Sequence, residues 1–259
     1  MKKILMLSLM VIYANADVTD LTIHQENILK NSQVSNSNIK QGEINMRDST
    51  VSELMVGLVD NKNLSKIDNV YIIDSQVSQN IVDINQSDVS RTNFYSDSEI
   101  INSRIEDDSV VTQGTLHVTH SGILQSSTFT LTSSINDARI EDSSTVSQNE
   151  IEINHATIDN LLMSGMHTIH NDSGSVSMVN STVTQGKLSV IDNSTLENST
   201  INMTSSIDKT SLTDATVDLC SIYIRNGANV SNVDIDGTCS MDSVQITGAN
   251  VVQGAVVVY

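Results

Sequence analysis

Proline and tryptophan are absent from this chain of 259 residues, and aromatic residues make up only 3% of it. The lack of proline suits a fold in which every backbone N–H donates to a hydrogen-bonded ladder, because proline has no N–H to give. Only 11 residues are glycine. Sharp turns must therefore be made mainly by asparagine, aspartate and serine, which hydrogen-bond locally and tolerate turn geometry.

Basic residues are also scarce, with 13 Lys and Arg against 31 Asp and Glu and a net charge of −18. Nucleic acid is therefore a disfavoured partner, as is an anionic membrane, because both need basic surface. The acidic residues are spread along the chain, and no EF-hand loop or glycine-rich calcium repeat is present. We interpret them as a solvated surface that keeps a β-rich protein soluble, in preference to a cation site.

Long apolar runs are missing, with one short exception at the start of the chain. Residues 1–16 combine Lys2 and Lys3, an apolar stretch and the small-residue box Ala14-Asn15-Ala16, which predicts a cleaved signal peptide. The stretch is too short to span a bilayer, and nothing later in the chain predicts an integral membrane segment. We expect an exported protein, secreted or held at the cell surface of a Gram-negative bacterium.

What the chain does have is a repeated phrase built on Gln-Gly or Gln-Asn. Its six anchors, mostly 34 to 38 residues apart, are Gln41, Gln79, Gln113, Gln148, Gln185 and Gln253. The last interval is twice as long, and a degenerate copy with Leu219 in the glutamine place fills it. Seven copies at this period predict a repeat architecture, in which each unit buries its apolar face only by stacking on its neighbours.

Three columns around the anchor are apolar in every copy. The residues two before it are Ile39, Val77, Val111, Val146, Val183, Val217 and Val251. Those three after it are Ile44, Val82, Leu116, Ile151, Leu188, Ile222 and Val256, and those five after it are Met46, Ile84, Val118, Ile153, Val190, Ile224 and Val258. The last two columns share one face of a strand, because side chains alternate, so this is strand periodicity with one buried face.

The predicted fold is all-β: a single-domain β-solenoid over residues 37–259, made of seven repeats with about two coils of roughly 17 residues in each. Residues 17–36 match the columns poorly and are expected to form an N-terminal cap or irregular segment. The pattern does not decide the handedness of the winding. The alternative is a disordered acidic chain, but disorder gives no reason for apolar residues to keep a fixed register.

Cys220 and Cys239 are the two cysteines of the chain. Their separation is close to the expected coil length, so adjacent turns could carry them, and in an oxidising compartment we predict a disulfide between them. Two small buried thiols are the alternative.

No catalytic or metal-binding constellation stands out. His120 and His155 share a corner column with Asp48, Gln86, Asp192 and Asn226, which indicates a stacked polar corner and leaves at most a weak metal site. Paired carboxylates occur at 106–108 and 141–142, but a polysaccharide-cleaving site would also want aromatic side chains for stacking. We expect no enzyme activity and no cofactor.

The segment Q-N-E-I-E-I-N-H-A-T-I-D-N (148–160) has a glutamine, then N-x-A, then a further amide. In this order it resembles the repeats of curlin-type functional amyloid subunits, while the longer period is similar to that of Fap-type subunits. The resemblance implies a solenoid fibre of bacterial biofilm, with Gln148, Asn154, Ala156 and Asn160 as stacking positions. The general repeat pattern is similar over 37–258, but the motif matches residue by residue only over 148–160. The N-x-A element is lost after Gln113 and Gln185.

Three functions remain in view after these observations. The first is a structural surface or matrix protein, either a fibre subunit or an adhesin, whose partners are itself, other matrix proteins or glycans. The second is a monomeric solenoid that binds glycans or ice, and the last is a polysaccharide-cleaving enzyme. Self-association head to tail is predicted through the apolar strand at the end of the chain, with Val256, Val258 and Tyr259 as assembly residues.

Overall fold

The computed structural model describes residues 18–57, 63–170 and 177–259. Within them the regular structure is all strand, and 29 strands form two sheets. The 19-stranded sheet contains β1 (Val18–Thr19), β2 (Thr22–Ile23), β3 (Glu26–Ser35), β6 (Thr50–Ser52), β7 (Met55–Val56), β8 (Asn63–Ile73), β10 (Asp88–Ser90), β11 (Asn93–Ile101), β12 (Arg104–Glu106), β14 (Ile123–Asn136), β15 (Arg139–Ile140), β17 (Thr157–His170), β18 (Ser177–Val179), β20 (Thr195–Glu197), β21 (Thr200–Asp208), β22 (Ser211–Thr213), β25 (Asn229–Ser231), β26 (Asp234–Asp242) and β27 (Gln245–Thr247). The 10-stranded sheet contains β4 (Asn38–Gln41), β5 (Ile44–Arg47), β9 (Gln76–Asn85), β13 (Val110–Thr119), β16 (Thr145–Asn154), β19 (Thr182–Ile191), β23 (Thr216–Leu219), β24 (Ile222–Ile224), β28 (Asn250–Gln253) and β29 (Val256–Val258).

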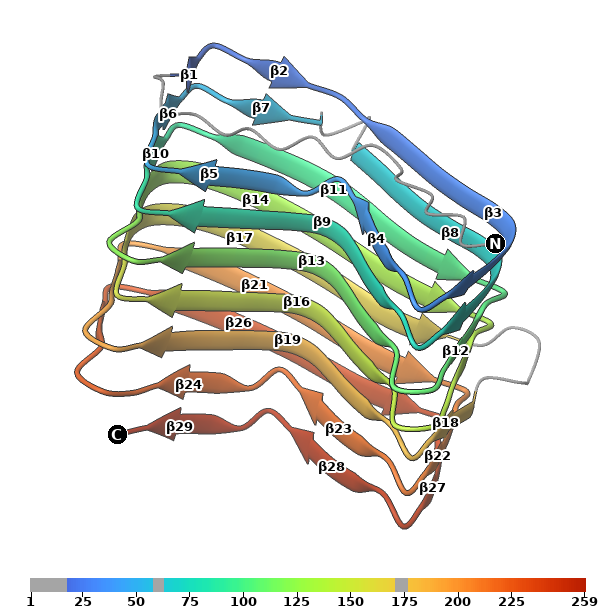
Figure 1. Cartoon of the computed structure of the whole chain (residues 1–259). Helices are drawn as coiled ribbons and strands as arrows, with labels where there is room; N and C mark the ends of the chain where they lie inside the picture. The colour runs from blue at the N-terminus through green and yellow to red at the C-terminus, as the bar shows by residue number, and fades with distance from the viewer. Residues whose placement is uncertain (1–17, 58–62, 171–176) are drawn as a thin grey trace.

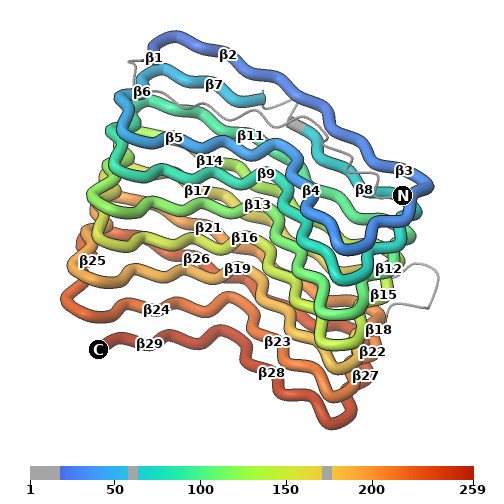
Figure 2. The backbone as a smooth tube through the Cα atoms, viewed as in Figure 1, coloured from blue at the N-terminus to red at the C-terminus, as the bar shows by residue number. Residues whose placement is uncertain are grey.

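The chain winds alternately through the two sheets, and successive turns stack in parallel register (Figure 1). In the 10-stranded sheet β9 pairs with β13, β13 with β16 and β16 with β19, and the glutamine anchors lie beside one another in this register. The tube view follows the stack from the first coil in blue to the last in red (Figure 2). The β-solenoid predicted from the repeat is confirmed.

Each repeat forms one coil, so the expectation of two coils of 17 residues is wrong. Gln79 and Gln113 are 34 residues apart and hydrogen-bonded across neighbouring coils. One coil is large because it crosses both sheets before it returns to the same column. The inward residues of one repeat therefore belong to two cores within one coil.

These two cores run along the stack, side by side. One contains the two columns after the anchor, such as Leu116 and Val118, together with Phe94 and Phe129, whose rings stack at 5.7 Å between neighbouring coils. The other contains the column before the anchor, such as Val111, packed on residues like Ile135. Repeated burial of aliphatic side chains, at about 1.5–3 kcal/mol each, is what holds the coils together.

The corners are made by residues in the left-handed backbone region, as the composition predicted. One corner column holds Asp48, Gln86, His120, His155, Asp192 and Asn226, all with φ between 49° and 55°. Asparagine and aspartate dominate these columns because their short polar side chains make this conformation less costly than it is for other residues with a Cβ.

The described part of the segment 17–36 is regular. Strands β1, β2 and β3 pair in parallel with β6, β7 and β8, so they form the first half of the first coil. The solenoid therefore begins before residue 37, the boundary expected from the sequence. The predicted signal peptide, 1–16, lies outside the described residues. No helix in the described part of the chain is long and apolar enough to cross a membrane.

Candidate functional sites

Five of the six glutamine anchors, from Gln41 to Gln185, lie inside the solenoid and form a ladder along its axis. Each Nε2 donates to the Oε1 of the anchor one coil earlier, at 2.8 Å for Gln79 to Gln41 and 2.7 Å for Gln113 to Gln79. The ladder continues from Gln148 to Gln113 at 2.8 Å and from Gln185 to Gln148 at 2.6 Å. All five side chains are buried. Within the ladder each amide is paired with its neighbour, which fixes one register, because a slipped coil would leave more buried amides unpaired.

The residue after each anchor is left-handed and explains the Gln-Gly or Gln-Asn phrase. This column holds Gly42, Asn80, Gly114, Asn149, Gly186, Cys220 and Gly254, with φ between 53° and 69°. The left-handed residue turns the chain from one core to the other. Glycine adopts it without strain, and asparagine at less cost than most other residues.

A second polar column faces the anchors from the 19-stranded sheet. Strand pairing lines up Ser65, Ser98, Ser133, His167, Ser205 and Cys239. Asn80 connects the two columns, because its Nδ2 donates to Ser98 Oγ at 2.9 Å and its Oδ1 accepts from Ser65 Oγ at 3.0 Å. We call the two columns together the polar seam, since they separate the two apolar cores.

His167 is the exception within this seam. It is fully buried, and neither ring nitrogen has a protein hydrogen-bond partner. Asn149 faces it, and a Cβ added to Gly165 would lie 2.6 Å from His167 Nε2, so the space is filled. Burial lowers the pKa of His167 from 6.5 to about 3, so the imidazole is neutral at physiological pH.

Cys220 and Cys239 are joined by a disulfide, and their Cα atoms are 6.2 Å apart. The expected coil length had suggested adjacent turns, but the two cysteines lie within the same turn. Cys220 follows β23 in the 10-stranded sheet and Cys239 lies on β26 in the other sheet, so the bridge crosses the polar seam. It does so where Leu219 interrupts the glutamine ladder, beyond Gln185.

The three expected assembly residues lie on the last coil, which has a neighbour on one side among the described residues. Val256 and Val258 are 65% and 66% exposed, whereas Ile44 and Met46, in the same columns of the first coil, are 3% and 1% exposed. Tyr259 is 72% exposed, and the Arg225 guanidinium lies 5.0 Å from its ring centre. The last anchor, Gln253, is exposed and donates to the Cys239 carbonyl at 2.6 Å.

The positions that the curlin-type resemblance singles out are divided between core and surface. Gln148 and Ala156 are buried, whereas Asn154 is half-buried and Asn160 is exposed. Asn160 stands at a left-handed corner and donates to Ser126 Oγ of the preceding coil at 3.2 Å.

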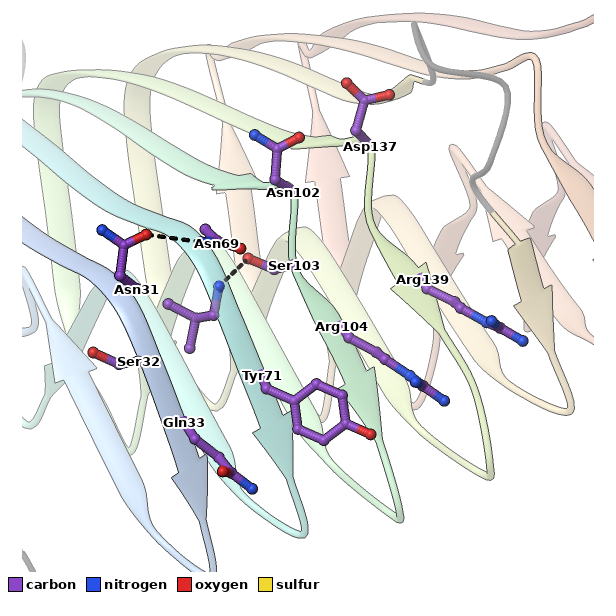
Figure 3. A pocket seen from close by; sticks show the side chains of 11 residues that line it. Asn31, Ser32, Gln33, Asn69, Tyr71, Asn102, Ser103, Arg104, Asp137 and Arg139 are labelled. Atoms are coloured by element: carbon purple, nitrogen blue, oxygen red, sulfur yellow. Dashed lines mark hydrogen bonds between the residues drawn. The ribbon is translucent and has the colours of Figure 1, made fainter.

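A shallow groove runs across the outside of the first coils and contains two arginines that the sequence did not predict as a site. Strand pairing lines up Gln33, Tyr71, Arg104 and Arg139 on one wall. Asn31, Asn69 and Asn102 form the opposite wall with Asp137, and the arginine side chains lie side by side (Figure 3). Because these residues differ in type from coil to coil, the repeat pattern gave no signal for them.

Two buried carboxylates hold the arginines. Arg104 Nε pairs with Glu106, and Arg139 Nε lies 2.5 Å from Glu141 Oε1. Arg104 also reaches Glu141, with its terminal nitrogen at 3.6 Å. The Tyr71 hydroxyl donates to Glu106, and this hydrogen bond raises the pKa of Tyr71.

Glu106, Glu141 and Asp142 also form the one described group of at least three His, Cys, Asp or Glu side chains whose oxygens lie within 4.8 Å of one another. The two arginines already occupy the two glutamates, so the geometry favours a charge-balanced cluster over a metal centre. His120 and His155 are not part of any such described group, and His155 Nδ1 instead contacts Asn154 Oδ1 at 2.8 Å.

No family model and no curated protein matches this sequence. Among solved structures, the chain is loosely similar to a TibC-catalysed hyper-glycosylated TibA fragment, with 12% identity and a TM-score of 0.13 over 93% of this chain and 99% of that one. It is also loosely similar to the catalytic domain of Agl-KA, with 11% identity and a TM-score of 0.12 over 92% of this chain and 62% of that one. Likeness at this level carries no argument about function.

Proposed function

We propose that this protein is an exported structural protein of the cell surface or extracellular matrix, a fibre subunit that adds copies head to tail. The supporting observation is the last coil. Val256 and Val258 belong to columns that are covered in the first five coils, but here about two thirds of each side chain is exposed. An apolar strand edge of this kind favours pairing with another strand.

The proposed occupant of this edge is the first coil of a second copy. The glutamine ladder supports this choice, because the anchors of the second to fifth coils each donate an amide hydrogen to the anchor one coil earlier. Gln41, in the first coil, has a buried Nε2 without a protein partner. If a second copy stacks after the last coil, its Gln41 would donate to Gln253 of the first copy with the polarity used everywhere else in the ladder.

Charge sets the conditions for assembly. Each chain carries a net charge of −18, so two copies repel one another at neutral pH and low salt. Protonation of carboxylates or added salt would weaken this repulsion while the apolar contact remains. The proposal therefore places fibre growth at mildly acidic pH or raised ionic strength.

The repeat pattern, which resembles that of curlin-type and Fap-type subunits, supports a role for such a fibre in bacterial biofilm, with export through the predicted signal peptide as part of the proposal. The protein acts in this proposal as a scaffold, without catalysis or cofactor. Export is the part tested most simply, by following whether residues 1–16 are removed from protein recovered outside the cell.

The test of assembly uses Val256→Lys together with Val258→Lys, which places two charges on the proposed contact. Val252→Lys is the matched control, because this column faces outward and already contains Lys40 in the first coil. Light scattering and electron microscopy would follow all three proteins across concentration, salt and acidic pH. We expect fibres of the unaltered and control proteins and monomers of the double variant.

Two results would overturn the proposal. The unaltered protein could stay monomeric under every condition, or the double variant could assemble as readily as the control. Circular dichroism of each variant shows whether the solenoid remains folded, so that loss of assembly is not confused with unfolding.

A further inference from the structure

We propose that the groove lined by Tyr71, Arg104 and Arg139 binds a sugar residue that carries a carboxylate, such as a uronic acid unit of a matrix polysaccharide. This inference goes beyond self-assembly and does not depend on it, because the groove lies on the outer surface of the first coils (Figure 3).

The first step is the fixed orientation of the two guanidinium groups. Each Nε is engaged by a carboxylate that is about 95% buried, Glu106 for Arg104 and Glu141 for Arg139. The arginine side chains are still 43% and 53% exposed. A guanidinium has five N–H donors in a planar fork, so terminal donors remain for a ligand and need little ordering when it binds.

The second step is their spacing. Arg104 and Arg139 are register partners in neighbouring coils, which places their backbones about 4.8 Å apart. Two parallel forks at this spacing suit the two oxygens of one carboxylate, which accepts charge-assisted hydrogen bonds from planar donors. Tyr71 is the next residue along the same wall, and the Arg104 guanidinium lies 5.2 Å from its ring centre.

The third step is the amide wall opposite. Asn31, Asn69 and Asn102 stand in one left-handed corner column and are all exposed. Asn69 Nδ2 donates to Asn31 Oδ1 at 2.7 Å, which orients these two amides. Amides both donate and accept, as sugar hydroxyls do. A groove with arginines on one wall and amides on the other therefore matches a ligand with one carboxylate and several hydroxyls.

Charge narrows the ligand class further. The buried glutamates balance the two arginines, and Asp137 stands in the same corner column as Asn102. The groove therefore has no strong positive field that would favour phosphate or sulfate polymers. Recognition would come from the geometry of the forks, with an affinity for a single sugar acid in the roughly millimolar range.

The experiment titrates a glucuronic acid disaccharide into the full chain by NMR or calorimetry, with the neutral glucose disaccharide of the same linkage as the comparison ligand. Measurements are repeated on the Val256→Lys, Val258→Lys protein, so that any self-association does not interfere. We expect binding of the acidic sugar and at least about tenfold weaker binding of the neutral one, the loss that follows from one charged hydrogen bond.

Two substitutions with opposite expected effects test the groove without touching the arginines. Asn102→Asp adds a negative charge at a corner where Asp137 already occurs, and should weaken binding of the acidic sugar. Asp137→Asn removes a charge where asparagine already occurs, and should strengthen it. Neither should alter circular dichroism, because both residue types occupy this column.

Arg139→Gln should reduce affinity for the acidic sugar at least about tenfold. Arg225→Gln is the matched control, since Arg225 also lies over a tyrosine, 4.5 Å from the ring centre of Tyr223, but on a different part of the solenoid. Three results would each overturn the proposal. The two sugars could bind with equal affinity, or neither could bind at about 10 mM, a concentration about tenfold above the expected dissociation constant. The loss of affinity with Arg225→Gln could also equal the loss with Arg139→Gln.

Discussion

Replacing His167 by serine should make the solenoid less sensitive to acid. The histidine is fully buried, burial is the cause of its lowered pKa, and serine occupies the same column at Ser133 and Ser205. In the unfolded chain the imidazole titrates near 6.5, whereas in the folded chain it titrates at about 3. Between these values the unfolded state binds the additional proton, so this residue lowers stability as pH falls.

The size of the effect follows from linkage. One pKa unit corresponds to about 1.4 kcal/mol, so the shift at His167 removes about 4 to 5 kcal/mol of folding free energy as pH falls from 6.5 to 3. Serine removes this contribution but leaves space where the ring was. The variant and the unaltered protein are therefore compared by the slope of their unfolding free energy against pH. The variant's stability at neutral pH alone would also include the loss of packing.

The assay is chemical unfolding followed by circular dichroism at intervals from pH 7.5 to 3.5. We expect the free energy of unfolding to fall more steeply for the unaltered protein than for His167→Ser, with the gap opening below pH 6.5. His120→Asn, at an exposed corner where Asn226 is the equivalent residue, should follow the unaltered protein. Parallel curves for the unaltered protein and His167→Ser would refute the reasoning.

Three further predictions concern the core, the bridge and the ladder. Leu116→Asp should lower stability by more than about 3 kcal/mol, since it buries an unpaired charge. The outward change Thr112→Asp, in a column that already contains Asp218, should be tolerated in urea unfolding. Peptide mass spectrometry without reduction should recover Cys220 linked to Cys239, and changing both to serine should lower stability by about 3 kcal/mol; free thiols in protein from its native compartment would contradict this. Gln148→Glu should destabilise at pH 7, where a carboxylate cannot donate along the ladder, and partly recover at pH 4; equal stability at both would count against a buried ladder.

Much of the fold could be read from the apolar columns. The positions two before, three after and five after each anchor, for example Val111, Leu116 and Val118, point inward. The first and second of these positions are five residues apart, an odd step that strict alternation does not permit. The left-handed residue after the glutamine, such as Gly114, absorbs this step, and it also carries the chain from one core to the other.

The coil length could not be derived in the same way, because a repeat fixes the spacing of equivalent residues and not the number of turns between them. The buried glutamines illustrate the difficulty. In sequence Gln148 looks like a surface residue, and only stacking on Gln113 and Gln185 satisfies its amide in the interior. The arginine groove was out of reach for a different reason, since Tyr71, Arg104 and Arg139 are neighbours only in the register of the coils.

The disulfide across the seam has a mechanical consequence. It joins two faces within one turn and adds no covalent link between successive coils, which are held by side-chain packing and hydrogen bonds, so a force along the axis should peel the stack one coil at a time. Each released coil of about 34 residues would extend by about 120 Å. The coil that contains Cys220 and Cys239 would release about 65 Å less, because the bridge holds back the 19-residue separation between them. A single-molecule pulling record would thus contain one short step among longer ones, and a reductant would lengthen that step alone.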